Sequence, residues 1–224
     1  MKKKKIILSW SGGKDCALAC HLIQLKGEHE IVALLTTITE PYNRVSMHGV
    51  PRALIEQQAE SLGYPLETVY IPQDCTNQEY GQRMEKALLR YKEHKVTAVA
   101  FGDVFLEDVR RYREQNLARA GMEALFPLWG QDTGELAGEF VDMGFEAIIT
   151  CTDSRVLDSS FIGKNIDRDF ISGLPSGVDP CGENGEFHSF VLNGPIFSRK
   201  IRVSAGEVVL RDSFYFCDLL ANDT

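Results

Sequence analysis

The chain has 224 residues, of which 44% are hydrophobic, and a formal net charge of −8. This composition supports a folded enzyme with a substantial core and argues against nucleic-acid binding, which draws most of its affinity from a basic surplus. Because no apolar run is long enough to span a membrane and the six cysteines form no CxxC pair, we expect a cytoplasmic protein with free thiols and no membrane partner.

The most informative segment lies at the end of the first predicted strand. An apolar run at residues 6–8 predicts this strand, two adjacent glycines follow, and a helical pattern begins near residue 16. Such a strand–loop–helix layout holds a phosphate with backbone N–H groups and a helix N-terminus. The predicted phosphate-binding residues are Ser9, Ser11, Gly12, Gly13, Lys14 and Asp15.

Asp15 is the unexpected member of this loop, because its carboxylate repels a phosphate unless a cation lies between the two. Mg²⁺ bridging Asp15 and a polyphosphate resolves the conflict, so Asp15 is the predicted metal ligand. The loop lacks the spacing of a Walker P-loop. A glycine-rich turn before an ordinary helix is the simpler alternative.

Strands and helices alternate along the first two thirds of the chain. Strands are predicted at 31–39, 66–71, 97–101 and 146–151, and helices at 51–62, 78–94, 104–120 and 135–143. This alternation predicts an α/β fold with a Rossmann-like, doubly wound parallel sheet. Ligands of such sheets bind at the carboxyl ends of the strands. Gly102 and Asp103 follow one strand, so we expect them to face the same crevice as the phosphate loop.

The pattern changes after about residue 152. Short helices and turns lead to a stretch rich in glycine and proline, and strands are predicted at 187–192, 200–204 and 208–211. We therefore expect an ATP-binding domain at 1–152 and a smaller α+β subdomain at 153–224. The smaller part is expected to close over the sheet edge and to hold the acceptor.

A second motif lies in this C-terminal part. Glu183 and Glu186 are three residues apart among glycines, and His188 lies two residues further on. Paired carboxylates on such a turn bind Mg²⁺, hold an ammonium ion or act as a general base. A solvated turn is the alternative.

The two motifs together resemble a known family. Residues 11–16 resemble the Ser-Gly-Gly-x-Asp-Ser signature of the PP-loop ATP pyrophosphatases, and residues 182–192 resemble the Gly-Glu-Gly-Gly-Glu-Tyr-Glu-Thr segment of the diphthine–ammonia ligase family. Further matching segments are Met47-His48, Gly102-Asp103, 127–129, 144–149 and 194–197. The resemblance implies a sheet of the adenine nucleotide alpha hydrolase type.

The resemblance also implies an amide-forming ligase. In that family ATP adenylates the carboxylate of diphthine, a modified histidine on a translation elongation factor. Ammonia then attacks the adenylate, and diphthamide, AMP and pyrophosphate are released. The implied partners are ATP, Mg²⁺, ammonia or ammonium, and an elongation factor that carries diphthine. Assembly of the chain into a homodimer is a further open alternative.

The roles of the candidate residues follow from this resemblance. Lys14 would stabilise charge on the departing pyrophosphate, and Asp103 would contact ribose, metal or substrate. Glu183 and Glu186 would bind ammonium and take its proton, or position the acyl-adenylate. His48 lies on a loop from which it would reach the nucleotide or the acceptor, although an incidental loop histidine is an equal alternative.

Some residues depart from the family pattern and keep alternatives open. Asn184, Phe187 and His188 stand where the family has Gly, Tyr and Glu. The acceptor could therefore be another carboxylate, for example in bacterial cofactor salvage, or the chain could be a non-catalytic ATP or AMP sensor. Cys16 begins a helix, where a lowered thiol pKa would suggest sulfur transfer on tRNA, but core packing is favoured. Trp10 could stack on adenine, and core packing is again favoured.

Overall fold

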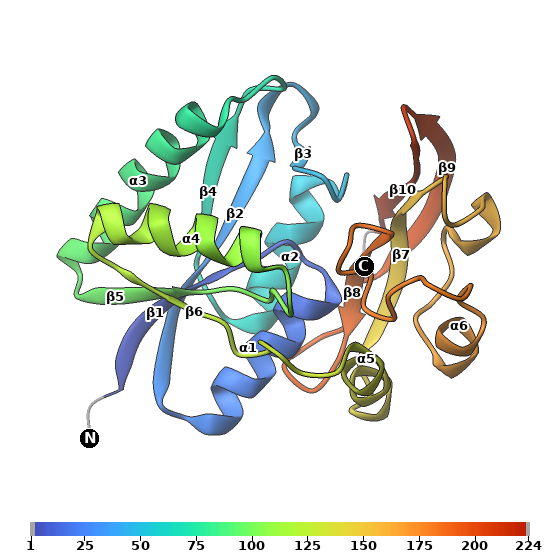
Figure 1. The fold of residues 1–224 in the computed structure, drawn as a ribbon, viewed down its shortest axis with the longest axis horizontal. Coiled ribbons are helices and arrows are strands. Elements are labelled where there is room, and N and C mark those ends of the chain that lie inside the picture. The colour runs from blue at the N-terminus through green and yellow to red at the C-terminus, as the bar shows by residue number, and fades with distance from the viewer. Residues whose placement is uncertain (1–2, 223–224) are drawn as a thin grey trace.

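The computed structural model describes residues 3–222 and contains two β-sheets that face each other across a shared core (Figure 1). The first sheet has the parallel order β4-β2-β1-β5-β6. Its strands are β1 (Lys4–Ser9), β2 (His29–Thr39), β4 (Leu66–Ile71), β5 (Val96–Ala100) and β6 (Glu123–Leu125). The short β3 (Arg44–Val45) runs antiparallel to the end of β2, beyond the last residue that pairs with β1.

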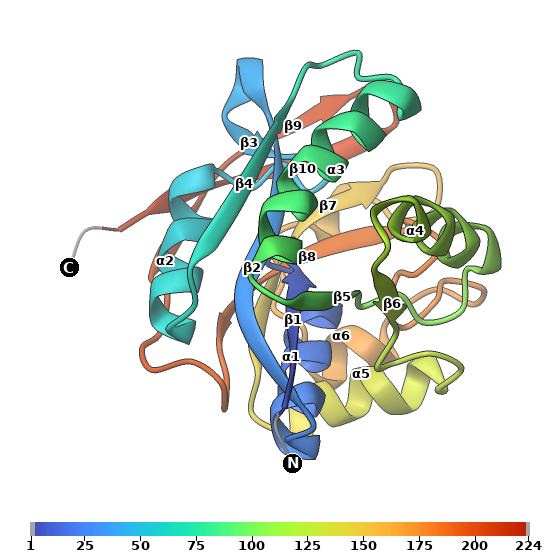
Figure 2. The same ribbon diagram turned by 90° about the vertical axis from the view of Figure 1, so that its left-hand side faces the viewer.

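Helices cover both faces of this sheet (Figure 2). The side chains of β1 alternate between the faces, as in any strand. Ile6 and Leu8 pack in the core that includes α1 (Lys14–Lys26) and α2 (Arg52–Leu62). Ile7 packs in the core that includes α3 (Asn77–Glu93) and α4 (Glu107–Ala120). The predicted Rossmann-like, doubly wound parallel sheet is therefore confirmed.

The second sheet is antiparallel and has the order β8-β7-β10-β9. Its strands are β7 (Glu146–Asp153), β8 (Phe187–Asn193), β9 (Val203–Arg211) and β10 (Phe214–Ala221). The prediction that 146–151 continues the parallel sheet is wrong, because β7 pairs with β8 and β10. Nearly every side chain of β7 is buried, so its sequence has the continuous apolar character of a parallel strand.

The position of β7 bears on the domain organisation. The predicted boundary after residue 152 falls inside β7, whose partners both come from the C-terminal part. The preceding helix α5 (Thr133–Asp142) also belongs there, since Asp142 pairs with Arg168 of α6 (Arg168–Ser172) and Phe140 stacks on Phe145. We therefore propose that the division lies between β6 and α5.

The two parts meet at the loop that follows β1. The backbone carbonyl of Gly12 accepts a hydrogen bond of 2.8 Å from the N–H of Val191 on β8. The amide of Gln58 on α2 donates to the carbonyls of Gly12 and Val191, at 3.1 and 2.6 Å, and accepts from Trp10 Nε1 at 2.8 Å. Trp10 is 1% exposed, which confirms core packing.

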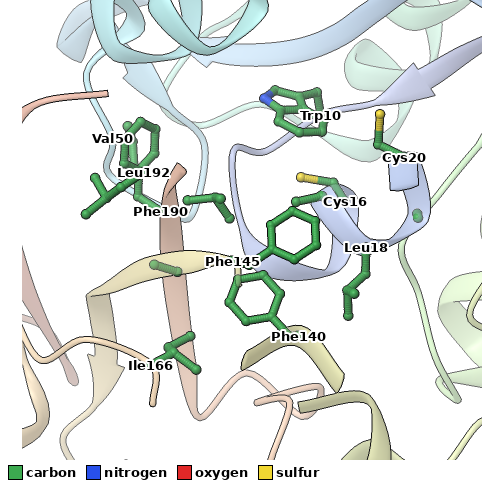
Figure 3. Close-up of a cluster of buried hydrophobic side chains, with 14 of the residues drawn as sticks. Trp10, Cys16, Leu18, Cys20, Val50, Phe140, Phe145, Ile166, Phe190 and Leu192 are labelled. Carbon is green, nitrogen blue, oxygen red and sulfur yellow. The ribbon is translucent and has the colours of Figure 1, made fainter. Parts of the chain in front are cut away.

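An apolar cluster continues this junction. Figure 3 shows Trp10 above Cys16, the side chains of Phe190 and Leu192 from β8 across from them, and Phe145 below Cys16, all within one buried cluster. Gly12 fits here only because it lacks a side chain: its φ is +84°, and a Cβ would lie 2.7 Å from both Gln58 Oε1 and Ile55 Cδ1. Within residues 3–222, no helix is long and apolar enough to cross a membrane.

We expect Gln58→Ala to lower the free energy of unfolding by about 2–4 kcal/mol, because it leaves Trp10 Nε1 and two carbonyls without their buried partner. Urea denaturation measures the change. The control is Gln57→Ala in the same helix, where the side chain is half-buried. Equal effects of the two substitutions would contradict the role given to Gln58.

Candidate functional site

A cavity of about 820 Å³ opens where the strands of the first sheet end. This volume is in the range of sites for small ligands. Its walls come from the ends of β1, β2 and β5, from the 46–48 segment and from residues 182–189. Nine residues of the predicted site line it: Ser9, Ser11, Gly13, Lys14, Asp15, His48, Gly102, Asp103 and Glu183. Gly12 and Glu186 are not among its lining residues.

The phosphate loop ends at the N-terminus of α1. Gly13 is the N-cap and supplies no side-chain hydrogen bond to the helix, so the first turn retains N–H groups for a ligand. A Cβ on Gly13 would lie 3.1 Å from the carbonyl oxygen of Ser189 and 3.4 Å from Ser11 Oγ. The hydroxyl of Ser189 also accepts from the N–H of Lys14 at 3.2 Å. A residue of the second sheet therefore supports the loop.

Lys14 is a buried cation that lines the cavity. Its side chain is 3% exposed, and Nζ lies 2.6 Å from Asp15 Oδ1 and 5.6 Å from the ring centre of Phe187. Burial lowers the pKa of Lys14, but the negative charges of Asp15 and Glu183 more than offset this, so the pKa is raised. Lys14 therefore stays protonated at neutral pH and presents a positive charge to a ligand.

Gly102 and Asp103 lie at the end of β5, beside the first turn of α1. A Cβ on Gly102 would lie 2.8 Å from the backbone carbon of Asp15 and 2.9 Å from the nitrogen of Cys16. Glycine is thus required for this close approach. Asp103 pairs with Arg113 Nε at 2.7 Å, and that guanidinium lies over the ring of Phe101. The structure therefore brings Asp103 to the cavity with its charge already compensated.

Of the two glutamates of the second motif, only Glu183 lines the cavity. Glu183 lines the cavity, and its Oε1 accepts from the backbone N–H of Val104 at 2.7 Å. Burial raises the pKa of Glu183, while this hydrogen bond opposes the rise. Glu186 is 7% exposed, and its Oε1 accepts from the N–H of Asp179 and from Asn184 Nδ2, both at 3.0 Å. Glu186 therefore holds the turn instead of facing the ligand space.

The rings of His48 and His188 lie against each other in the lining of the cavity, with their centres 4.3 Å apart and their planes tilted by 31°. Burial and the charge of Lys14 lower the pKa of His48 to about 4, and burial and His48 hold the pKa of His188 well below its usual value. Both rings are therefore neutral at pH 7. The Nδ1 of His48 donates to the carbonyl of Ser46 at 3.3 Å, which leaves Nε2 unprotonated.

Cys16 does not have the low pKa that its position suggests. It is buried in the apolar cluster, its Sγ donates to the carbonyl of Gly13 at 3.0 Å, and burial raises its pKa to about 11. The thiol is therefore protonated at neutral pH. Burial and the raised pKa of Cys16 support the favoured interpretation, core packing, over a reactive thiolate, because desolvation outweighs the helix N-terminus.

The predicted site residues omit some lining residues that the structure adds. Ser189 and His188 come from β8 and Thr36 from β2. The Oγ1 of Thr36 is buried and has no hydrogen-bond partner among residues 3–222. A polar residue within an apolar strand was the signal in each case, but only the folded chain shows which face it occupies.

Comparison with known proteins assigns the chain to a family. The model of the diphthamide synthase N-terminal domain matches residues 3–124, and that of the C-terminal domain matches residues 132–220. The chain belongs to the diphthamide synthase family. The phosphate loop lies within the match to the N-terminal domain, and residues 182–189 lie within the match to the C-terminal domain. The cavity of this chain is therefore lined by residues of both domains.

Similar proteins include curated members of the family. The human diphthine–ammonia ligase is 27% identical over 92% of this chain and 85% of its own length. The zebrafish (Danio rerio) enzyme of that name is 28% identical over 92% and 89%, and the enzyme of Schizosaccharomyces pombe is 28% identical over 96% and 38%. A solved U34-tRNA thiolase from Methanococcus maripaludis is 17% identical, with a TM-score of 0.37 over 63% of this chain and 57% of its own.

The neutral state of His48 predicts a specific pH dependence of stability. Its pKa is about 4 in the folded chain and 6.5 without the fold, so the unfolded chain binds more protons between these values. The free energy of unfolding should therefore fall as the pH decreases from 6.5 to 4. His48→Gln should make this fall shallower, as measured by urea denaturation at a series of pH values.

The control is His94→Gln, at the exposed end of α3. It separates a specific effect of His48 from the general effect of losing a histidine. A fall of the same steepness in the His48→Gln chain and in the unmodified chain would show that His48 is not held neutral by the fold.

Proposed function

We propose that the protein is an ATP-dependent amide ligase that converts the diphthine of a translation elongation factor to diphthamide, with ammonia as the nitrogen donor and AMP and pyrophosphate as products. The observation that carries the proposal is the N-terminus of α1, whose N-cap residue Gly13 supplies no side-chain hydrogen bond, beside the buried, protonated Lys14. The family membership and the names of its relatives support the choice of reaction and acceptor.

The phosphate loop supports the nucleotide half of the reaction. Backbone N–H groups at the start of α1, with the hydroxyls of Ser9 and Ser11, would hold the phosphates of ATP. Lys14 would stabilise the charge that develops as pyrophosphate leaves the α-phosphate. Gly102 keeps β5 close to this turn and Asp103 faces the same space, where we place the ribose or the substrate.

The donor set fits Mg²⁺ as a partner of the nucleotide. One oxygen of Asp15 binds Lys14, the side chain is 29% exposed, and it lines the cavity. Within residues 3–222, no three His, Cys, Asp or Glu side chains gather into a metal site. Mg²⁺ bound through one carboxylate and the phosphates of its substrate is the usual arrangement in such enzymes. The ion would supply charge neutralisation of the phosphates.

The amide half of the reaction would depend on Glu183. Its carboxylate lies in the cavity, and its raised pKa brings it closer to the value at which a carboxylate takes a proton efficiently. We propose that it binds ammonium and accepts its proton. Glu186 would act as a positioning residue, because it fixes the turn from which Glu183 projects. His48, with an unprotonated Nε2, would accept a hydrogen bond from nucleotide or acceptor.

With α-labelled ATP, Mg²⁺, ammonium and an elongation factor that carries diphthine, we expect labelled AMP that depends on the acceptor. If AMP forms with other carboxylates but never with diphthine, the adenylation mechanism stands and the acceptor is a different carboxylate. ADP as product, or no turnover with any acceptor, would contradict the adenylation mechanism.

Lys14→Met should reduce the rate of acceptor-dependent AMP formation by about 10²–10³-fold, because the transition state loses a buried cation. Steady-state kinetics measure the change, and thermal unfolding checks that the variant folds. Lys26→Met, in the exposed last turn of the same helix, is the matched control and should retain its rate. A Lys14→Met rate within threefold of the unmodified rate would exclude Lys14 from the reaction.

A further inference from the structure

The second sheet ends in an exposed edge strand, β9. In the order β8-β7-β10-β9, the strands β8 and β9 form the two edges. Most side chains of β8 are buried, and Val191 of β8 binds the phosphate loop. No residue of β9 is buried, and its only strand partner among residues 3–222 is β10 (Figure 1). The backbone N–H and C=O groups on the outer side of β9 are therefore available to another strand.

The end of β9 that leads into the β9–β10 hairpin carries exposed apolar side chains. Val208 and Leu210 are 48% and 55% exposed. The register with β10 is regular over residues 208–211 and shifts just before them, so this segment keeps the geometry of a regular strand. Natural edge strands are commonly protected from pairing by lysine or proline, and residues 207–211 contain neither. The segment thus has the features of a strand that pairs with another chain.

The charged residues at the two ends of this segment have no partners within the chain. Glu207 and Arg211 are exposed, and neither forms an ion pair among the residues that the structure describes. Both line a small cavity beside β9 together with Val209, which is consistent with one face of the strand for all three. Four residues of a strand span roughly 13 Å, so Glu207 and Arg211 of one chain cannot pair with each other.

An antiparallel pairing of β9 with β9 of a second copy supplies both missing partners. When the two-fold axis passes Val209, position 207 of each copy lies opposite position 211 of the other, and position 208 lies opposite position 210. Each Glu207 then faces an Arg211, and each Val208 faces a Leu210. Such opposite-charge and apolar cross-strand pairs stabilise a sheet. The segment Glu-Val-Val-Leu-Arg is therefore complementary to itself in this register.

Other registers lose this complementarity. A shift by two residues places Val209 or Ser213 opposite Glu207, according to its direction, and removes both ion pairs. A shift by one residue turns every side chain of one strand to the other face. Because the net charge of −8 opposes self-association, a second copy needs local charge pairs of this kind, and the register centred on Val209 provides them.

We propose that β9 pairs with β9 of a second copy of this chain, so that the second sheets of two copies join into one continuous sheet around a two-fold axis at Val209. Five residue pairs bury less surface than a standard interface, so the dimer is weak. This inference is independent of the proposed function, because neither Glu207 nor Arg211 lines the nucleotide cavity.

Sedimentation velocity tests the proposal. The unmodified chain at about 100 μM should show a dimer that dissociates on dilution. Glu207→Arg and Arg211→Glu should each weaken the dimer by about tenfold or more, because like charges then face each other twice. The chain with both substitutions should recover the original affinity within about threefold. Arg119→Glu, at an exposed arginine of α4, is the matched control and should leave the dimer unchanged.

A mixture of the two single variants gives the sharpest result. Glu207→Arg is positive at both positions and Arg211→Glu is negative at both, so a mixed pair contains two ion pairs while each variant alone contains none. We expect the equimolar mixture to form a heterodimer, which a tag on one variant captures. Thermal unfolding checks that both variants fold. A loss of structure in one variant would not be restored by the other, so recovery in the mixture is specific to the pairing.

A cross-link provides a measurement without charge reversal. Val209 faces itself across the axis, at a separation that a disulfide spans. Val209→Cys should therefore form a disulfide-linked dimer on mild oxidation, whereas Ser204→Cys, an exposed position of the same strand away from the axis, is the control and should not.

Each outcome decides the proposal. A monomer in the unmodified chain at this concentration overturns it. A dimer that persists in both single variants uses another surface and overturns it as well. The proposal also fails if folded single variants stay monomeric when mixed, or if Val209→Cys cross-links no better than Ser204→Cys. None of these results changes the proposed function, which is tested by acceptor-dependent AMP formation.

Discussion

The site depends on the hydrogen bonds that join the phosphate loop to the second sheet. The carbonyl of Gly12 accepts from Val191, and Gln58 binds both residues from a third element, so β1, α2 and β8 share one buried junction. This junction fixes the direction of the first turn of α1 and places Ser189 beneath it. The cavity is therefore a product of the contact between the two parts, and neither part contains it alone.

Burial sets the electrostatics of the cavity. The same desolvation that keeps Cys16 as a thiol also keeps His48 and His188 uncharged. Lys14 is different because adjacent negative charge holds its proton. The loop therefore presents one fixed cation and the N–H groups of a helix N-terminus, an arrangement that favours an anionic ligand. Asp15 is paired with Lys14 and lines the same cavity, and in the proposed function it would contribute an oxygen to Mg²⁺.

Local signals in the sequence predicted the first sheet and the edge of it at which the cavity opens. The strand–glycine–helix order at β1 is contained in one short segment, and Gly102 directly follows the predicted strand β5. The reason for glycine at position 102, its close approach to the backbone of Asp15, appears only in the folded chain. The assignment of β7 failed because a strand buried on both faces has no periodicity that distinguishes the centre of an antiparallel sheet from a parallel one. Spacing likewise placed Glu183 and Glu186 together, whereas two glycines with positive φ, Gly182 and Gly185, turn the chain so that the second carboxylate faces inward.

The sequence by itself determined the phosphate loop, the doubly wound sheet and the membership of a family, because each depends on residue types at short, fixed spacings. The tertiary structure alone decided which side chains meet across long separations: His48 with His188, Glu183 with the end of β5, and Gly12 with Val191. It also decided their protonation, since a pKa responds to burial and to neighbouring charge. Both of these are properties of packing, which exists only once the two sheets have come together.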